Sequence, residues 1–198
     1  MATLSKLIIT ASWAALLFVG FGFAWQYEAT PGRAAKAPSD WPAGSSIPID
    51  GRRPTLIMFA HPQCPCTRAS LDLLSSIRSG NNAAAVYVVI VQPPGLEGGL
   101  DQSPLAAQAK AISGVRVLAD NGSEARRFGA ATSGEVLLYT KEGQRLFSGG
   151  ITSARGHVGP SKGAAGISAY LQHGTIPSPA MPVFGCSLLG AASSVNPR

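Results

Sequence analysis

Hydrophobic and polar positions follow two alternating periods between residues 54 and 176. Short apolar runs, typical of buried strands, alternate with stretches in which apolar residues recur every three or four positions, as in amphipathic helices. We expect strands at 56–60, 85–91, 115–118, 135–140 and 145–148 and helices at 67–78, 104–112, 123–128 and 164–173. This order predicts an α/β fold that begins with parallel strands and ends with an antiparallel hairpin.

Turn and cap residues mark several of these boundaries. Ser103 and Ser123 stand where N-cap residues are expected before short helices, and Pro104 suits the first position of its helix. Gly149-Gly150 follows the hairpin and is expected to end its second strand. These signals mark where the predicted helices and strands begin or end.

An uncharged apolar stretch precedes the domain. Leu7–Trp25 carries no charge and has about the length of a helix that crosses a bilayer. Lys6 precedes it and Glu28 follows, a bias that places the N-terminus in the cytoplasm. A cleaved signal peptide is the alternative, but its apolar core is normally shorter, and no small-x-small site follows Phe23. We expect residues 1–27 to be a single-pass transmembrane anchor in the cell membrane, with the C-terminal domain on the extracytoplasmic side.

Two segments rich in small residues and Pro flank the predicted domain at 54–176. Residues 28–53 contain much Pro, Gly, Ala and Ser and predict a flexible linker. Near its end, Trp41 and Ile47 are candidates for packing on the domain. Residues 177–198 form a Pro/Ser-rich C-terminal tail, which holds the third cysteine.

The charge balance limits the classes of partner. The chain has 16 Lys and Arg against 10 Asp and Glu, a formal net charge of +6. The basic residues are isolated, without the dense run and interleaved aromatics typical of nucleic-acid binding. We therefore expect no nucleic-acid partner, although the mild excess would suit an anionic membrane surface.

Three cysteines follow the anchor. Cys64-Pro65-Cys66 lies between the first predicted strand and the first helix, and Cys186 lies in the tail. Cys66 is expected at or near the first turn of the helix, where free N–H groups and the helix dipole favour a thiolate. A thiolate attacks disulfides and binds soft metals. An exported domain permits disulfides, and the odd count leaves at least one thiol unpaired within the chain.

Two parts of the chain match a known family. The first is the strand, turn and helix around Cys64, and the second comprises the runs VLAD (117–120), ARRFGA (125–130) and VLLYTKEG (136–143). Over residues 55–172 the chain resembles the thioredoxin superfamily, and within it the membrane-anchored TlpA/ResA-like thiol-disulfide proteins, with the short RedB-like group nearest. The resemblance implies a thioredoxin-like fold, a central mixed sheet flanked by helices, in which Cys64 attacks a disulfide and Cys66 resolves the product.

Three positions depart from the usual pattern of that family. One residue separates Cys64 from Cys66 instead of two, and Gln63 stands where Trp is usual. Ser133-Gly134 stands where a cis-proline usually faces the cysteines. A disulfide between Cys64 and Cys66 would close a small, constrained ring, which favours an oxidising pair.

These observations predict an exported, membrane-tethered thiol-disulfide oxidoreductase that uses Cys64 and Cys66, needs no cofactor and acts on protein thiols and disulfides. One alternative is copper binding by Cys64, Cys66 and His157, a soft donor set similar to the copper-delivering Sco branch. Another is a non-catalytic adaptor, because fold does not fix function. His61 could stabilise a thiolate, ligate a metal or be solvated. Cys186 could exchange with the pair or pack in the tail.

Overall fold

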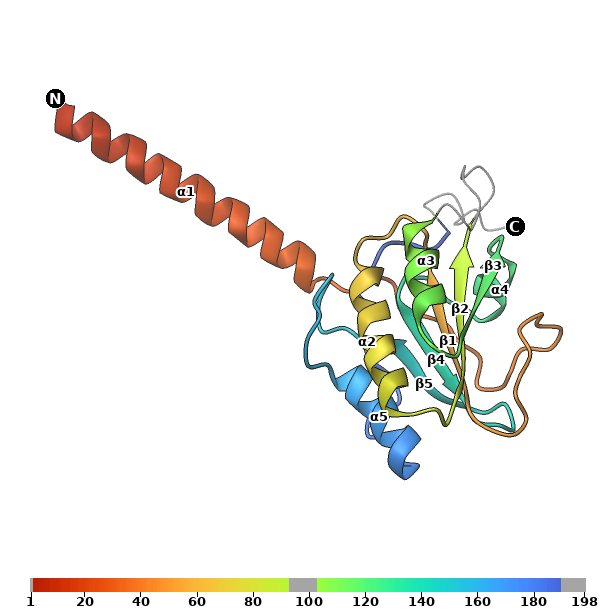
Figure 1. Ribbon diagram of the computed structural model, residues 1–198. Coiled ribbons are helices and arrows are strands. Elements are labelled where there is room, and N and C mark those ends of the chain that lie inside the picture. The colour runs from red at the N-terminus through yellow and green to blue at the C-terminus, as the bar shows by residue number, and fades with distance from the viewer. Residues whose placement is uncertain (1, 93–102, 190–198) are drawn as a thin grey trace. The chain divides into compact units, whose positions relative to one another are not determined.

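The central layer of the domain is a mixed β-sheet. The computed structural model describes residues 2–92 and 103–189, and among these, five strands form one sheet in the order β3-β2-β1-β4-β5 (Figure 1). The strands are β1 (Thr55–Ala60), β2 (Ala85–Val91), β3 (Val115–Asp120), β4 (Glu135–Tyr139) and β5 (Arg145–Gly150). The β1–β2 and β2–β3 pairs are parallel, and the β1–β4 and β4–β5 pairs are antiparallel. Every residue of β1, β2 and β4 is buried, which explains why these strands have long apolar runs.

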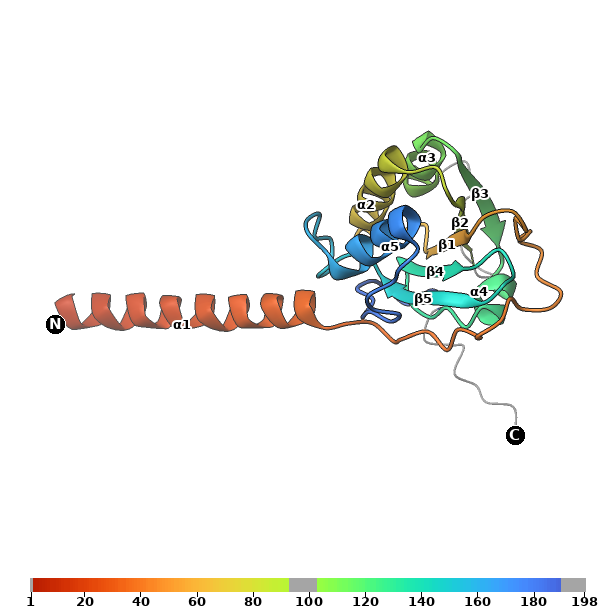
Figure 2. The same cartoon turned by 90° about the horizontal axis from the view of Figure 1, so that it is seen from below.

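Helices cover both faces of the sheet (Figure 2). Three of them, α2 (Thr67–Gly80), α3 (Pro104–Ala111) and α5 (Lys162–His173), lie on one face, and α4 (Ser123–Arg127) lies on the other. Successive side chains of a strand point to opposite faces of the sheet, so one strand contributes to the core on both faces. In β1, for example, Met58 belongs to the cluster on the α2 side, whereas Phe59 belongs to the cluster that contains residues of α4. The predicted thioredoxin-like α/β fold is confirmed.

The prediction for the end of the hairpin was wrong. Gly149 and Gly150 do not end the strand but belong to β5, where they pair with Val136 and Glu135. The C-terminal segment runs directly against this part of β5, so a Cβ on Gly149 would collide with the backbone of Met181. The two glycines therefore permit a close approach of backbone segments inside the strand.

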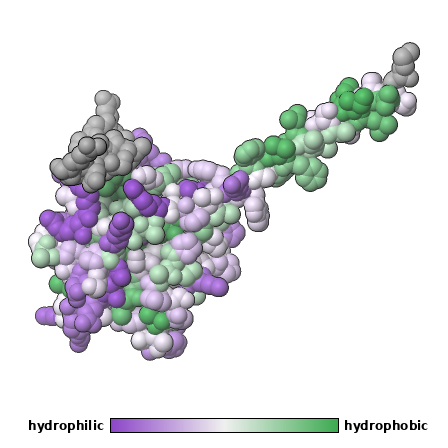
Figure 3. Space-filling view, turned by 180° about the vertical axis from the view of Figure 1, so that it is seen from behind, coloured by the Kyte–Doolittle hydropathy of each residue, from purple (hydrophilic) through white to green (hydrophobic). Residues whose placement is uncertain are grey.

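The N-terminal helix α1 (Ala2–Ala29) is a unit of its own. Its stretch Thr3–Ala29 is long and apolar enough to cross a membrane, by length and composition, and Figure 3 shows apolar side chains along it. A signal sequence can have the same properties, so α1 is a candidate membrane span. The chain from Pro31 onward forms the second compact unit.

The segment between α1 and β1 packs on the α4 side of the sheet. The Trp41 ring lies 5.1 Å from the Phe128 ring and 5.2 Å from the Tyr139 ring, both edge-on. Ile47 is 2% exposed. The expected packing of Trp41 and Ile47 on the domain is confirmed, and each such aromatic pair contributes about 0.5–1.5 kcal/mol beyond its burial.

Candidate functional site

Cys64 and Cys66 lie between β1 and α2, as the sequence predicted. The Cys64 side chain is 2% exposed, whereas Cys66 is the N-cap residue of α2 and is partly exposed. The Thr67 N–H donates to the Cys64 carbonyl oxygen (3.3 Å), so Cys64–Thr67 forms a turn with Pro65 at its second position. The fixed φ of proline suits this position. The turn directs Cys64 inward and leaves Cys66 at the surface.

The loop before β4 faces Cys64 with a serine. The Ser133 hydroxyl oxygen accepts a hydrogen bond from the His61 N–H (2.7 Å) and lies 2.7 Å from the Thr67 hydroxyl oxygen. Among the described residues no peptide bond is cis. At the position that matches the family's cis-proline, this chain has a serine that follows a trans peptide bond. Ser133 thus connects the start of β4 to the cysteine turn through its side chain.

Gly134 is required beside this serine. Its φ is +88°, a backbone conformation that favours glycine. A Cβ at Gly134 would also come within 2.9 Å of the Ser70 hydroxyl oxygen. The bond from the Gly134 N–H to the Phe59 carbonyl oxygen (2.8 Å) fastens the loop to the end of β1. Glycine therefore lets the loop approach α2 closely enough for Ser133 to reach the cysteines.

The C-terminal segment brings the third cysteine to the same place. Thr132 and Ser187 form an antiparallel bridge, and the Ser133 N–H donates to the Cys186 carbonyl oxygen (2.8 Å). Gly185 packs so closely that a Cβ there would collide with the Ser133 carbonyl oxygen. In this position the Cys186 thiol lies close enough to Cys64 to help lower its pKa, and Cys64 in turn helps to raise the pKa of Cys186. The two cysteines of the turn are therefore joined by a third that is far from them in sequence.

The electrostatics of the site favour a thiolate on Cys64. Burial acts to raise the pKa of the Cys64 thiol, but hydrogen bonds from Thr67, from the backbone and thiol of Cys186 and from Ser133 outweigh burial and lower the pKa. Burial and the negative charge of Cys64 raise the pKa of Cys66. Burial, together with a hydrogen bond to Cys64 and its charge, raises the pKa of Cys186 to about 11.

The expectation that Cys66 would gain a thiolate from the helix terminus was therefore wrong. The Cys66 side chain makes no capping hydrogen bond to the N–H groups of α2. The pKa is lowered instead at Cys64, two residues earlier, where Thr67, Cys186 and Ser133 outweigh the effect of burial. A first negative charge on Cys64 then opposes a second one on Cys66.

Arg155 supplies positive charge to the site. Its Nη1 donates to the Gly185 carbonyl oxygen (2.6 Å), and its charge acts to lower the pKa of both Cys66 and Cys186. His157, the residue of this loop that the sequence made a candidate, is exposed. The residue of the loop that brings charge to the cysteines is the arginine two positions earlier, for which the sequence held no signal.

His61 acts at this site through its backbone and a neutral ring. Burial lowers the pKa of the imidazole, and its Nδ1 accepts a hydrogen bond from the Gln63 N–H (3.3 Å). The geometry thus favours an uncharged ring with its proton on Nε2. Of the roles considered for His61, stabilisation of a thiolate by positive charge is not supported.

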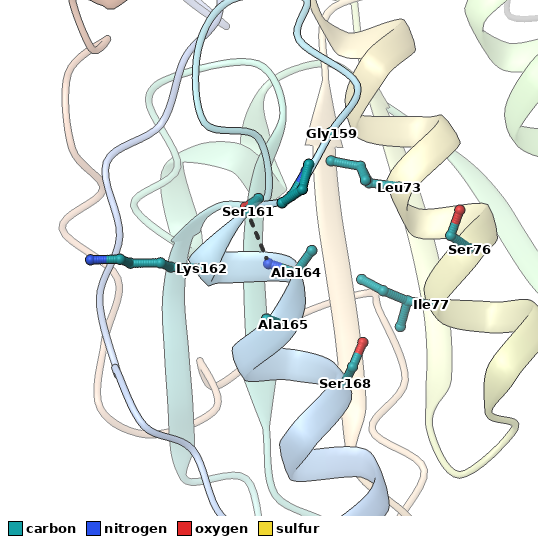
Figure 4. A pocket seen from close by; sticks show the side chains of 10 residues that line it. Leu73, Ser76, Ile77, Gly159, Ser161, Lys162, Ala164, Ala165 and Ser168 are labelled. Atoms are coloured by element: carbon teal, nitrogen blue, oxygen red, sulfur yellow. Dashed lines mark hydrogen bonds between the residues drawn. The ribbon is translucent and has the colours of Figure 1, made fainter.

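Two hollows lie near the turn and near α5. One of about 230 Å³ opens beside Cys64, lined by Pro62, Gln63, Cys64, Pro65, Arg68, Pro104 and Leu105. Cys64, which is 2% exposed, is thus one of the residues at the edge of a hollow. A larger hollow of about 600 Å³ lies between α2 and the start of α5 (Figure 4), where Leu73 and Ile77 face Ala164 and Ser168. No cysteine lines this second hollow.

Removing the Thr67 hydroxyl should make Cys64 less reactive. The substitution Thr67→Val keeps the shape of a buried side chain but removes the leading donor to the Cys64 sulfur. We expect the pKa of Cys64 to rise and its alkylation at neutral pH to slow, measured as the rate of iodoacetamide labelling against pH, with the labelled residue identified by tandem mass spectrometry. The matched control is Thr55→Val, at the opposite end of β1 and equally buried. Equal labelling rates in both variants would contradict the role of Thr67.

Comparison with known proteins supports the fold. No model of a known protein family matches the sequence, and a search of curated proteins finds no significant match. Several solved structures are similar, two of them with a TM-score above 0.5. A hypothetical protein from Sinorhizobium meliloti has 22% identity and a TM-score of 0.56, over 80% of this chain and 93% of that chain. An uncharacterized conserved protein from Geobacillus kaustophilus has 17% identity and a TM-score of 0.54, over 84% and 95%. At these identities the likeness concerns the fold alone. A thioredoxin-like protein from Aeropyrum pernix aligns more loosely, with 13% identity and a TM-score of 0.46, over 79% of this chain and 97% of that chain.

Proposed function

We propose that this thioredoxin-like protein is a membrane-tethered thiol-disulfide oxidoreductase whose attacking group is the Cys64 thiolate. The observation that carries the proposal is the setting of Cys64. Its thiol has a lowered pKa, lies beside two further thiols and lines a hollow that a reactant can enter. A depressed pKa with a neighbouring resolving thiol is what disulfide exchange requires.

The proposed reaction has two steps. The Cys64 thiolate attacks one sulfur of a partner disulfide, so a mixed disulfide forms and the partner's other sulfur leaves as a thiolate. A second thiol of this chain, Cys66 in the sequence-based prediction, then attacks the Cys64 sulfur. This attack releases the partner's first sulfur and leaves an intrachain disulfide. Two electrons pass to the partner, and the same steps in reverse would oxidise a partner dithiol.

The partners and the location are part of the proposal. We infer that α1 holds the protein in the cell membrane with its N-terminus in the cytoplasm, so that the domain from Pro31 onward meets protein thiols and disulfides on the extracytoplasmic side. The length and apolar composition of α1 support the anchor. The charge bias around the apolar stretch supports this orientation.

The copper alternative does not fit the residues. It requires Cys64, Cys66 and His157 to converge on one ion, but His157 is exposed. Within residues 2–92 and 103–189, no group of three or more His, Cys, Asp or Glu side chains is arranged to hold a metal ion. We therefore propose no step through copper. The adaptor hypothesis predicts instead that the thiols take no part in exchange.

A redox titration of the full chain in detergent micelles tests the proposal. Samples are equilibrated in buffers of reduced and oxidised glutathione, quenched with acid and alkylated, and the free thiols are counted by intact mass. We expect two of the three thiols to be lost together and to return in reducing buffer, as a two-electron couple. If all three thiols remained alkylatable in every buffer, the adaptor hypothesis would replace the proposal.

A further inference from the structure

The C-terminal segment places a thiol at the reacting sulfur without belonging to the cysteine turn. Here the resolving step of the proposed function can be assigned to a residue. We propose that Cys186, and not Cys66, is the resolving cysteine, so that the oxidised protein contains a disulfide between Cys64 and Cys186. The inference rests on the proposed function and concerns only its second step.

The backbone around Cys186 is held on both sides. The Ser133 N–H binds the Cys186 carbonyl oxygen, and two positions further on the Leu188 N–H donates to the Ala131 carbonyl oxygen (3.0 Å). The Leu188 side chain is fully buried. On the preceding side, Arg155 holds the Gly185 carbonyl oxygen. Cys186 is therefore presented to Cys64 by an ordered segment, which reduces the entropy lost when the two sulfurs join.

Cys66 is less well placed to bond with Cys64. The two residues are separated by one position in a turn that continues into α2, and Cys66 already has helical angles (φ −65°, ψ −29°). Side chains two positions apart in a helical turn do not face each other, and a disulfide demands facing Cβ atoms within a narrow range of distances. Cys64 is near enough to raise the pKa of Cys66, but the helical backbone at Cys66 does not favour the facing arrangement that a disulfide needs.

Formation of the mixed disulfide also changes the pKa of Cys186. In the reduced protein burial is the main cause that raises the pKa of Cys186, and the negative charge of Cys64 raises it further, so the Cys186 thiol keeps its proton. When Cys64 enters a mixed disulfide, its negative charge is gone, and that cause disappears. Arg155 still favours a negative charge on Cys186. Formation of the mixed disulfide therefore prepares Cys186 to lose its proton and attack.

The Cys186 thiolate attacks the Cys64 sulfur of the mixed disulfide, the bond between Cys64 and Cys186 forms, and the bond between Cys64 and the partner sulfur breaks. The electron pair of the broken bond leaves on the partner sulfur, which becomes a thiolate and takes up a proton from water. The Cys186 proton goes to solvent before the attack. No further oxidant is needed, because the partner disulfide is the oxidant.

The test uses oxidised glutathione as the probe and the full chain with Cys66→Ser or Cys186→Ser. Trypsin should leave Cys64 and Cys66 together in residues 53–68 and Cys186 in residues 163–198, so a disulfide to Cys186 joins two peptides, whereas one between Cys64 and Cys66 does not. We expect joined peptides in the unsubstituted chain and in Cys66→Ser. In Cys186→Ser we expect the glutathione adduct on Cys64 to reach a level at least about tenfold higher than in the unsubstituted chain.

The opposite pattern would overturn the inference. If Cys66→Ser accumulated the adduct while Cys186→Ser resolved it, Cys66 would be the resolving cysteine and the proposed function would stand. If no variant formed an adduct on Cys64, the proposed function itself would fail.

A second variant keeps the Cys186 thiol but should displace the backbone segment that positions it. Gly185→Ala places a Cβ against the Ser133 carbonyl oxygen and should displace the segment, so we expect slower resolution although Cys186 is present. Circular dichroism of each variant verifies that the domain is folded. Unchanged resolution in folded Gly185→Ala would contradict the role of the ordered segment.

Discussion

Cys64→Ser is expected to abolish disulfide exchange, with a loss of about 1,000-fold or more in the rate of reduction of a model disulfide. The reason is chemical, since a serine hydroxyl at this position cannot form a mixed disulfide, and loss of a covalent nucleophile typically costs several orders of magnitude. Stability should change little, because serine is nearly the same size and the Thr67 and Ser133 hydroxyls can bond to it. The measurement is the rate of insulin disulfide reduction with dithiothreitol as the electron source.

The matched control for this experiment is Cys66→Ser, two residues away and partly exposed. The assignment of Cys64 as the attacking thiol predicts that Cys66→Ser still forms the mixed disulfide. If Cys66→Ser lost the first step while Cys64→Ser retained it, the two roles would be exchanged. If neither substitution changed the rate, the thiols would be structural.

The fold could be predicted because its signals are local. The runs at 56–60 and 85–91 are apolar throughout because β1 and β2 are covered on both faces. At Ser103 the predicted cap is confirmed, since its hydroxyl oxygen accepts from the Ala106 N–H (3.3 Å). Such patterns depend on neighbours within one turn or one strand, and a single sequence contains them.

The cap of α4 shows how a local prediction can choose the wrong residue. Ser123 was expected to cap this helix, but the Asp120 carboxylate accepts from the Glu124 and Ala125 N–H groups (3.0 Å each). Asp120 ends β3, and a carboxylate makes the stronger, charge-assisted bond to helix N–H groups. Both residues are acceptable cap residues, and only the course of the chain decides between them.

The sequence left two alternatives open for Cys186, exchange with the pair or packing in the tail, and could not decide between them. No periodic pattern connects Cys186 with Cys64, and the contact depends on how the C-terminal segment crosses the loop at 131–133. One signal was present. Val183 and Phe184 are apolar residues in a segment rich in Pro and Ser, and they were interpreted as a sign of ordered packing next to Cys186. That interpretation is confirmed, since they are 2% and 8% exposed.

A buried carboxyl group provides the second large prediction. Glu135 begins β4 and is 0% exposed. Its Oε2 accepts from the Ala131 N–H (3.2 Å), while Oε1 has no hydrogen-bond partner among the described residues. Burial raises the pKa of Glu135 from 4.5 to about 7, although backbone hydrogen bonds from Ala131, Thr132 and Ala35 oppose the shift. The folded protein therefore prefers this side chain in its neutral form.

The sign of the stability effect follows from that shift. Below pH 4.5 the carboxyl is protonated in both the folded and the unfolded chain, so the raised pKa does not lower the free energy of unfolding. Between pH 4.5 and 7 the unfolded chain loses the proton first, so the free energy of unfolding decreases as the pH rises. Above pH 7 the full cost is present, about 3 kcal/mol for a shift of this size.

Glu135→Gln should remove this cost, because glutamine has the shape of the neutral carboxyl and no charge. We expect urea denaturation to give a free energy of unfolding about 3 kcal/mol higher than that of the unsubstituted chain at pH 8, with the difference vanishing near pH 4. Glu142→Gln, on an exposed turn, is the control and should show no such increase with pH. A constant difference at all pH values would mean that Glu135 titrates normally.

The same variant separates stability from chemistry. The Glu135 carboxylate binds Ala131, and the loop from Ala131 to Ser133 holds both Cys64 and the Cys186 segment. The amide oxygen of glutamine can accept the same Ala131 bond, so the loop should keep its position. We therefore expect Glu135→Gln to exchange disulfides at the unsubstituted rate while being more stable above pH 7. A fall in exchange rate together with increased stability would show that the charge on Glu135 contributes to the reaction, which the present assignment of roles excludes.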